Sequence, residues 1–299
     1  MAERVTVELD GRRLSLSKLD KVLYPDTGFT KAQVIDYYAR IAPTMLHHIT
    51  DRGLTLRRYP DGVDGPSFFE KRCADHRPDW LQTASGPGDR GGAIDYCRLT
   101  EPASLAWTAN MAALELHAPM ARCHDLEAPT MQVFDLDPGL PATIIECCSV
   151  ALSLREVLES VGLDCYPKTS GSKGLQVYVP LNTPHTHNHA SSFALAVGQL
   201  LMKQRPNDIV VNMAKSERKG KVLVDWSQNS RHKTTIAVYS LRARNRPTVS
   251  TPVTWDEVSG AADGEPLTFE AADVLERVRQ LGDLFAPTLE QCQELPTGR

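Results

Sequence analysis

The chain has 299 residues, of which 41% are hydrophobic and 23% are charged, and its formal net charge is −4. This composition is ordinary for a globular protein with one large domain or two small ones. No run of about 18 or more apolar residues occurs, which excludes a transmembrane helix, and the charged N-terminal stretch lacks the apolar core of a signal peptide.

The first half of the chain predicts helices and short strands in alternation. A Pro-Asp-Thr-Gly turn leads to Thr30, which is suited to be the N-cap of a helix. Residues 54–72 predict a strand, a turn-rich connection and a short aromatic-basic element, and residues 83–92 predict a surface loop. A helix at 105–114 and a short strand at 115–118 follow. The helix that begins after Thr30 has its apolar positions at Val34, Tyr37, Tyr38 and Ile41.

The second half predicts more regular elements. Thr254 and Glu257 have the spacing of a capping box, which opens one or two C-terminal helices. The irregular alternation of strands and helices indicates a mixed α/β fold of the α+β kind, with central sheets flanked by helices. Without a clear linker, we expect a single domain over residues 1–299. Before the C-terminal helices, the sequence predicts a strand at 131–137, a helix at 142–161, two strands within 163–181, a helix at 190–203 and a strand within 221–230.

The cysteines argue against a metal or disulfide framework. They are seven in number, scattered, and without a CxxC pair. Zinc ribbons and disulfide frameworks have paired spacings, so we expect reduced thiols in a cytoplasmic protein. The cysteines are Cys73, Cys97, Cys123, Cys147, Cys148, Cys165 and Cys292.

The charge is unevenly distributed along the chain. Between Lys203 and Arg246, eleven basic residues and three acidic residues give a local net charge of +8, whereas residues 256–290 hold nine acids and two arginines, a net −7. A local basic block can hold phosphate groups whatever the overall charge. A solvated charged face has the same composition, so both interpretations stay open.

Two aspartates end the apolar stretch 131-MQVFDLDPG-139. On a strand, Asp135 and Asp137 project from one face roughly 6–7 Å apart, and carboxylates that close repel one another unless a cation lies between them. Hard divalent ions take oxygen ligands, and bridging aspartates can clamp a pair of them. A turn at the end of a strand has the same spacing, so the two aspartates alone do not establish a metal site.

A third aspartate strengthens the metal hypothesis. Asp225 ends another apolar run, 222-VLVDWSQ-228, where a buried carboxylate needs a partner. A third acid from a neighbouring strand is what a two-metal site on a sheet requires. The alternative is an edge-strand acid that pairs with Lys221 or Arg231.

The stretch 169-TSGSKGLQVYV-179 predicts a loop that can hold an anion. Gly171 and Gly174 permit the backbone to turn successive N–H groups toward one point. Ser170 and Ser172 add hydroxyl donors and Lys173 adds a positive charge. The spacing is not that of a Walker loop, and a plain hairpin turn is the alternative.

Several weaker signals accompany these motifs. Arg242 and Arg244 alternate on an expected strand and could reach a triphosphate, although such a pair is also typical of a solvated stripe. His117 lies in apolar surroundings, where a core histidine is commoner than a ligand. The run 185-HTHNH-189 fits a solvated loop better than a zinc site. Phe68 and Phe69, with Arg57, Arg58, Lys71 and Arg72 around them, combine stacking faces with phosphate-binding charge.

Taken in order, seven motifs resemble the polymerase domain of bacterial ligase D, in the archaeo-eukaryotic primase superfamily. The resemblance covers residues 14 to 285. It implies a metal-dependent nucleotidyltransferase that extends or fills DNA ends in double-strand-break repair by non-homologous end joining, with a preference for ribonucleotides over deoxyribonucleotides. The motifs are DKVLYP, the FFEK element, LHAP, FDLDPG, TSGSKGL, VDWSQNS and YSLRAR.

The resemblance also assigns roles to residues of this chain. Asp135, Asp137 and Asp225 are expected to be the catalytic metal ligands, for two ions of Mn²⁺ or Mg²⁺. Lys21 and Lys31 match lysines that grip a 5′-phosphate at a break. The expected nucleotide-binding residues are His117, Ser170, Ser172, Lys173, Gln176, Gln228, Arg242 and Arg244. The expected DNA-binding residues are Lys21, Lys31, Arg57, Arg58, Phe68, Phe69 and Lys71.

One departure from the family pattern concerns Gln176, where the family usually has histidine. Glutamine can donate a hydrogen bond but cannot carry a positive charge. The alternative function is therefore a module that binds and bridges DNA ends with little polymerase activity. A metal-dependent nuclease is a third hypothesis, but it leaves the SGSKG loop without a purpose.

The resemblance also implies partners and a location. The expected substrates are 5′-phosphorylated ends, gaps and primer-templates, together with nucleoside triphosphates. No KxDG adenylation motif occurs in the sequence. A stand-alone polymerase of this kind would need Ku and a separate ligase. We expect it in the cytoplasm at the nucleoid, with no membrane partner.

Overall fold

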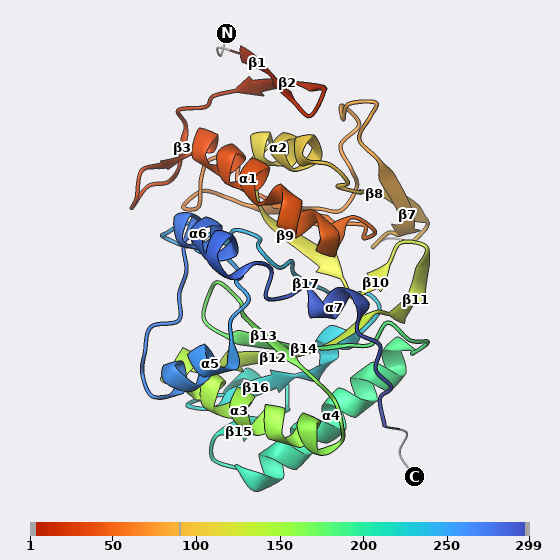
Figure 1. The fold of residues 1–299 in the computed structure, drawn as a ribbon, viewed down its shortest axis with the longest axis vertical. Coiled ribbons are helices and arrows are strands. Elements are labelled where there is room, and N and C mark those ends of the chain that lie inside the picture. The colour runs from red at the N-terminus through yellow and green to blue at the C-terminus, as the bar shows by residue number, and fades with distance from the viewer. Residues whose placement is uncertain (1–3, 90, 297–299) are drawn as a thin grey trace. The chain divides into compact units, whose positions relative to one another are not determined.

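The computed structural model describes residues 4–89 and 91–296, which divide into two compact units. Unit 1 comprises residues 1–119, 236–250 and 269–282, and unit 2 comprises residues 120–235, 251–268 and 283–299. The chain thus leaves unit 1 after β9 (Ala113–Pro119) and returns to it twice, as the colours of Figure 1 show. None of the helices described is both long enough and apolar enough to cross a membrane.

Unit 1 is built on a sheet with the strand order β17-β9-β5-β6. Strand β5 pairs antiparallel with both β6 and β9, and β17 is the strand at which the chain enters this unit. Helices α1 and α2 pack against each other, and α2 contacts β9 (Figure 1). The bounds are β5 Thr55–Arg58, β6 Phe68–Glu70, β9 Ala113–Pro119, β17 Thr234–Ile236, α1 Lys31–Ile49, α2 Pro102–Asn110 and α6 Ala271–Leu281. Three hairpins complete the unit: β1 (Arg4–Leu9) with β2 (Arg12–Ser17), β3 (Val22–Tyr24) with β4 (Phe29–Thr30), and β7 (Thr83–Pro87) with β8 (Ala93–Cys97).

Helix α1 begins where the sequence predicts. Thr30 and Gln33 form a reciprocal capping box, which satisfies N–H groups that the first turn leaves without partners. The predicted apolar face is buried and packs in the core, and each large side chain buried in this way contributes about 1.5–3 kcal/mol. The hydroxyl groups of Tyr37 and Tyr38 donate to the backbone oxygens of Tyr239 and Leu114, both at 2.7 Å.

Three expectations for unit 1 were wrong. Residues 83–87 are not a loop, because they form β7 and pair with β8 from Thr83↔Cys97 to Pro87↔Ala93; residue 90, within the same stretch, lies outside the described residues. The helix expected at 105–114 ends at Asn110, since Ala112 has a left-handed φ of 57° that stops it. Residues from Ala113 onward already belong to β9.

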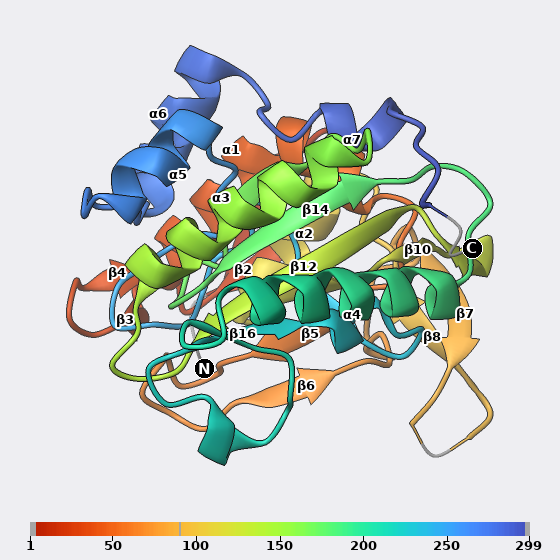
Figure 2. The same ribbon diagram turned by 90° about the horizontal axis from the view of Figure 1, so that it is seen from below.

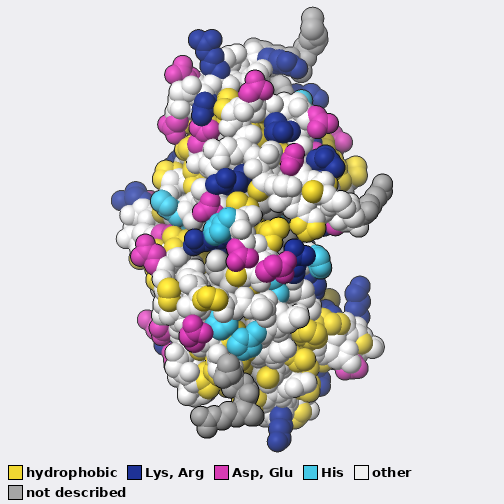
Figure 3. All heavy atoms as spheres, turned by 90° about the vertical axis from the view of Figure 1, so that its right-hand side faces the viewer, with side chains coloured by type: hydrophobic (Ala, Val, Ile, Leu, Met, Phe, Trp, Pro, Cys, Tyr) yellow, Lys and Arg dark blue, Asp and Glu magenta, His cyan; other side chains and the backbone are white. Residues whose placement is uncertain are grey.

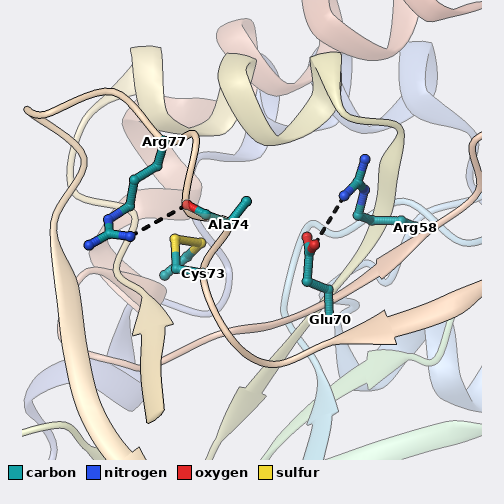
Figure 4. Close-up of a disulfide and its surroundings, with 6 residues drawn as sticks. Arg58, Glu70, Cys73, Ala74 and Arg77 are labelled. Atoms are coloured by element: carbon teal, nitrogen blue, oxygen red, sulfur yellow. Dashed lines mark hydrogen bonds and ion pairs between the residues drawn. A yellow bond between two sulfur atoms is a disulfide. The ribbon is translucent and has the colours of Figure 1, made fainter.

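The third wrong expectation concerns the cysteines. Cys73 and Cys97 form a disulfide within unit 1 (Figure 4), and both are 1% exposed. The bond links the segment after β6 to the end of β8. Beside it, Arg77 donates to the backbone oxygen of Ala74. The other five cysteines are free thiols, as the sequence predicts.

Unit 2 is built on a five-stranded sheet with the order β13-β14-β12-β16-β15. All pairs are antiparallel except β15 with β16. Helices α3 and α4 cover one face of this sheet (Figure 2), α5 packs on α3, and α7 contacts β14. The bounds are β12 Met131–Pro138, β13 Tyr166–Thr169, β14 Leu175–Pro180, β15 Ile209–Val210, β16 Val222–Asp225, α3 Ile144–Ser160, α4 His187–Gln204, α5 Trp255–Ala262 and α7 Pro287–Glu290. A small hairpin of β10 (Ala121–Arg122) and β11 (Asp125–Pro129) and the short 3₁₀ helices η1 (Lys215–Glu217) and η2 (Trp226–Asn229) complete the unit.

The histidine run of unit 2 does not form the expected solvated loop. Thr186 is the N-cap of α4, and His187 lies in its first turn. Both ring nitrogens of His187 face backbone oxygens, that of Asn229 at 2.8 Å and that of Leu126 at 3.2 Å. His185 is also buried, with its Nδ1 3.2 Å from Nδ1 of His189. The two partners of His187 are distant in sequence, so the local pattern could not reveal them.

Candidate functional site

The pairing register of unit 2 places four polar side chains in one row across the sheet. Lys168 of β13 is opposite Gln176 of β14, which is opposite Asp135 of β12, which is opposite Asp225 of β16. Directly opposed residues project from the same face of a sheet. The other face carries Val224, which packs against Gly198 of α4. The row therefore lies on the face opposite to α4.

Hydrogen bonds connect the row from Lys168 to Asp135. Nζ of Lys168 donates to Oε1 of Gln176 at 2.6 Å, and Nε2 of Gln176 donates to Oδ1 of Asp135 at 3.0 Å. Burial raises the pKa of Asp135, and the charges of Asp137 and Asp225 raise it further, whereas the Gln176 bond and the Lys168 charge lower it. Asp135 is thus held close to two other carboxylates.

Asp225 has a different set of partners. Its Oδ1 accepts from the backbone N–H of Ser227 at 2.9 Å and from the Ser227 hydroxyl at 2.5 Å. Its Oδ2 accepts from Nε2 of Gln228 at 3.2 Å and lies 3.8 Å from Nζ of Lys233. The ion-pair partners considered from the sequence bind elsewhere, because Lys221 donates to the backbone oxygen of Pro206 and Arg231 pairs with Glu127.

The donor set of the row suits a hard cation. Within residues 4–89 and 91–296, no three His, Cys, Asp or Glu side chains are grouped as a ready-made metal site. Asp135 and Asp225 nevertheless face each other directly, with Asp137 on the same strand face. Oδ2 of Asp135 accepts no hydrogen bond from any residue that the structure describes. Carboxylates that repel one another fit Mg²⁺ or Mn²⁺ as oxygen ligands, and Lys233 supplies an opposing charge 3.8 Å from Asp225.

The SGSKG loop follows β13, and two of its N–H groups converge on one atom of the loop itself. The backbone N–H groups of Ser172 and Gly174 both point to Oγ of Ser170, at 3.2 and 3.1 Å. Gly171 has a left-handed φ of 67°, and a Cβ on Gly174 would lie 2.2 Å from the backbone oxygen of Leu136. The convergence point is therefore occupied by the loop's own hydroxyl, whose proton remains available as a donor.

A cavity of about 270 Å³ lies beside this loop in unit 2. Ser172 and Lys173 line it together with Leu140, Ile144 and Leu267. Its wall thus combines a cationic loop with apolar side chains.

In unit 1, the expected residues His117 and Arg242 meet at a buried acid, Glu115. Nε2 of His117 is 3.1 Å from Oε2 of Glu115, and Nε of Arg242 is 3.3 Å from Oε1. The backbone N–H of Ala243 also donates to Oε1. Arg57 is 3.5 Å from Oε2. Burial by itself raises the pKa of Glu115, but the His117 hydrogen bond and the Arg242 charge outweigh it and bring the pKa to about 2.

The histidine and the arginines of this group have further properties. Burial lowers the pKa of His117, which overcomes the opposite effect of Glu115, so the ring is neutral near pH 7. Arg242 and the exposed Arg244 follow an isolated bridge between Leu241 and Val249, not the strand that the sequence predicts. The prediction of a strand there was wrong.

Phe68 and Phe69 form an exposed aromatic pair on β6, with exposed fractions of 45% and 58%. The Arg58 guanidinium lies over the Phe68 ring at 5.3 Å, and the Arg57 guanidinium over the Phe69 ring at 5.1 Å. Arg58 also pairs with Glu70 at 3.0 Å (Figure 4). Phe69 packs edge-on against His117. Core packing accounts for neither ring.

The three expected DNA-binding lysines of unit 1 all have partners. Nζ of Lys21 lies 2.7 Å from Oδ1 of Asp61, and Lys71 pairs with Asp89. Lys31 is buried and donates to the backbone oxygen of Ser17 at 2.6 Å. Burial, followed by the charges of Lys18, Lys21 and Arg58, lowers the pKa of Lys31 to about 8. Three cationic side chains thus lie near Lys31, and two of them, Lys21 and Arg58, are paired with acids.

Much of the basic block between Lys203 and Arg246 is neutralised within the fold. On the face shown in Figure 3, the described basic and acidic side chains are interspersed. Some cations of the block are paired with acids and others are exposed, and whether the block holds phosphate groups stays a prediction. The paired cations are Arg205 with Asp208, Arg231 with Glu127, Lys233 with Asp225, Arg242 with Glu115 and Arg246 with Glu270.

Sequence reasoning missed three residues that contact the predicted site residues: Glu115, Lys168 and Lys233. Glu115 stands two positions before His117, and this i, i+2 spacing on a strand could have suggested it. Lys168 sits opposite Gln176 only because β13 and β14 pair in one register. Lys233 approaches Asp225 after the turn that η2 makes.

Comparison with known proteins identifies the family of this chain. The family described as LigD, primase-polymerase domain, matches residues 30–285. The multifunctional non-homologous end joining protein LigD of Mycolicibacterium smegmatis is 45% identical over 277 residues, which are 92% of this chain and 36% of that protein. The bifunctional LigD of Bacillus subtilis is 28% identical over 95% of this chain and 45% of its own length. The chain thus spans about a third to under a half of these relatives.

A solved structure gives the same result for the fold. The polymerase domain of Mycobacterium tuberculosis ligase D, determined in complex with DNA, superimposes with a TM-score of 0.87 at 42% identity. The match covers 93% of this chain and 98% of that one. The mixed fold and the family resemblance expected from the sequence are confirmed. This chain belongs to the family of LigD primase-polymerase domains.

Proposed function

We propose that the chain is a template-directed nucleotidyltransferase, a primase-polymerase that extends or fills DNA ends during non-homologous end joining. The family supports this proposal, as does the relative of known structure, which binds DNA. The observation that carries it is the facing pair Asp135 and Asp225, with Asp137 on the same face of the sheet. Such an acidic centre on a sheet suits nucleotidyl transfer.

The acidic centre would hold two divalent ions, Mn²⁺ or Mg²⁺, through Asp135, Asp137 and Asp225. Bound there, such ions would supply positive charge for the primer 3′-hydroxyl and for the triphosphate. The role of the carboxylates is positional, and no protein nucleophile is required. Ser227 fixes one oxygen of Asp225, while Gln228 and Lys233 would have to release the other.

The SGSKG loop supports binding of the triphosphate. Lys173 supplies a cation and Ser172 a hydroxyl at the cavity beside the loop. Ser170 holds the loop together through its oxygen and keeps its proton for a ligand. In unit 1, neutral His117 and the cations Arg242 and Arg244 are proposed nucleotide contacts. A preference for ribonucleotides is part of this proposal.

Unit 1 has the features of a DNA-binding surface. The exposed rings of Phe68 and Phe69 can stack on bases, and Arg57 and Arg58 bring charge beside them from the neighbouring strand β5. Lys71 would add a phosphate contact once it leaves Asp89. The cationic surroundings of Lys31, together with Lys21, suit a 5′-phosphate. Ku and a DNA ligase are the partners that end joining would require.

The test is extension of a gapped primer-template with a 5′-phosphate, with Mn²⁺ or Mg²⁺ and with ribonucleotides or deoxyribonucleotides. We expect the wild type to extend the primer and the double variant Asp135→Ala/Asp137→Ala to lose at least about 100-fold in rate, because charge stabilisation of the transition state is removed. Asp36→Ala, an exposed acid on α1, is the control. Full activity in the double variant would overturn the proposal.

A second candidate is a module that binds and bridges DNA ends without extending them. The observation that favours it is the burial of Gln176, which is held by Lys168 and Asp135 and brings no positive charge to a triphosphate. Tight binding of 5′-phosphorylated ends by the wild type without extension would support this candidate. Recovery of synthesis by Gln176→His would then identify Gln176 as the cause.

A further inference from the structure

Lys168 is a buried cation that the expected site does not include. It is 1% exposed, and its ammonium group lies 5.3 Å from the centre of the Tyr178 ring. Its backbone is paired on both sides, with Gln176 of β14 on one side and with Pro252 through an isolated bridge on the other. A lysine ordered to this extent loses about 2 kcal/mol of side-chain entropy, so its position has to be stabilised by its contacts.

The contact of Lys168 determines how the Gln176 amide is oriented. A lysine ammonium can only donate hydrogen bonds, so the atom that faces it at 2.6 Å must be Oε1. The Tyr178 hydroxyl donates to the same oxygen at 3.2 Å. With the amide turned round, two amide hydrogens would face the ammonium group. Nε2 is therefore directed to Asp135.

The orientation of the amide determines how Asp135 is held. Nε2 donates to Oδ1 at 3.0 Å, and Oδ2 accepts no hydrogen bond from the described residues. Gln176 is itself 3% exposed, so water cannot readily replace either partner. Lys168 is thus connected to Asp135 through the Gln176 amide, in addition to the direct effect of its charge.

We propose that Lys168 is a positioning residue for the acidic centre, and that it holds Asp135 in place for a divalent cation by fixing the amide of Gln176. The proposal rests on the proposed function, in which Asp135 is a metal ligand. It gives Gln176 a role that differs from the contact with the triphosphate expected from the sequence. Partners of metal ligands typically contribute about 10–100-fold in metal affinity or activity.

Two effects of removing Lys168 have opposite signs, which makes the proposal testable. Loss of a positive charge near Asp135 would by itself tighten the binding of a divalent cation. Loss of the donor would free the Gln176 amide and weaken cation binding. Lys168→Met loses both charge and donor, whereas Lys168→Gln loses the charge but keeps an N–H donor. Comparing the two separates positioning from simple electrostatics.

The experiment is a titration of the purified chain with Mn²⁺, followed by electron paramagnetic resonance of the free ion. We expect Lys168→Met to bind Mn²⁺ about 10-fold more weakly than the wild type, and Lys168→Gln to bind it at least as tightly as the wild type. Lys219→Met, an exposed lysine of unit 2, is the control. Tighter binding by both Lys168 variants, or equal weakening of both, would overturn the proposal.

Two further measurements complete the test. Gln176→Leu removes the amide that connects Lys168 to Asp135, so it should weaken Mn²⁺ binding as Lys168→Met does. The double variant Lys168→Met/Gln176→Leu should bind Mn²⁺ no more weakly than either single variant. If Lys168→Met fails to fold, as judged by thermal melting, Gln176→Leu and Lys168→Gln decide in its place. In primer extension, we expect a lower kcat for Lys168→Met with the nucleotide KM within about twofold.

The outcomes for the two proposals can be told apart. A wild type that binds Mn²⁺ but extends no primer would count against the proposed function and not against the role of Lys168. Suppose that the wild type extends primers and that Lys168→Met and Gln176→Leu bind Mn²⁺ as tightly as it does. That result would count against the role of Lys168 alone.

Discussion

At the residue scale, Glu115 shows how one buried carboxylate can position a histidine and two arginines. It is 2% exposed and accepts bonds or ion pairs from His117, Arg242 and Arg57. Removal of one member of such a group leaves buried charges without a partner, which is more damaging than removal of an exposed ion pair. Glu115 therefore contributes to stability as well as to the arrangement of proposed nucleotide contacts.

Glu115 predicts a specific dependence of stability on pH. Its pKa of about 2 in the folded protein lies below the ordinary value of 4.5, so ionised Glu115 stabilises the folded state above pH 4.5. This contribution is lost as the pH falls from 4.5 toward 2. We expect Glu115→Gln to lower the free energy of unfolding by about 3 kcal/mol at pH 7. The difference from wild type should shrink across that acid range.

Urea unfolding at a series of pH values measures this difference. Glu156→Gln, an exposed acid on α3, should stay close to the wild type at every pH. A Glu115→Gln deficit that is the same at pH 3 and pH 7 would contradict the assignment.

At the element scale, the SGSKG loop depends on the strand beside it. Gly174 approaches the backbone of β12 so closely that a Cβ would lie 2.2 Å from the oxygen of Leu136. Gly162, by contrast, has open space around it and needs glycine only for its left-handed φ of 78°. The two glycines thus serve different physical purposes.

This difference predicts unequal effects of the same substitution. Gly174→Ala should force the loop away from β12 and lower the free energy of unfolding by about 3 kcal/mol, as overpacking against backbone does. Gly162→Ala should lose only about 1–2 kcal/mol from backbone strain. Chemical denaturation of both variants provides the comparison, and a Gly174→Ala protein as stable as the wild type would show that the approach is not so close.

The elements also show which local signals were sufficient. The capping boxes at Thr30 with Gln33 and at Thr254 with Glu257 start α1 and α5, because they involve contacts within one turn. The β7–β8 hairpin was missed, since its first strand contains Gly86 and Pro87, residues that are depleted in strands. Pairing with β8 stabilises this strand despite its composition.

At the scale of the whole molecule, the chain combines two compact units and one disulfide. The Cys73–Cys97 bond joins residues 24 positions apart in unit 1. Its effect falls mainly on the unfolded chain, whose freedom it restricts. The single domain expected from the sequence stays a prediction, because the two units describe compactness and not independent folding.

Reduction of the disulfide should therefore destabilise the protein. For a loop of this length we expect the free energy of unfolding to fall by roughly 3 kcal/mol. Thermal melting with and without a thiol reductant measures the change. In the double variant Cys73→Ala/Cys97→Ala the reductant should have no effect, and an identical melting temperature of the wild type under both conditions would contradict the prediction.

The sequence by itself determined the family and the mixed fold, and it singled out three aspartates as candidate metal ligands. It could do so because these depend on the periodicity of apolar residues and on short contiguous motifs, such as FDLDPG and TSGSKGL. The sequence could not determine the partners of the aspartates. Whether Asp135 faces Asp225, and whether Gln176 donates to Asp135, depends on strand register.

Only the tertiary structure decided those partners, because register is fixed by strands that are far apart in the chain. Pairing of β13, β14, β12 and β16 brings Lys168, Gln176, Asp135 and Asp225 into one row. A shift by one residue would turn each of these side chains to the other face. The same reason explains Glu115 and the disulfide, whose partners come from separate elements of unit 1.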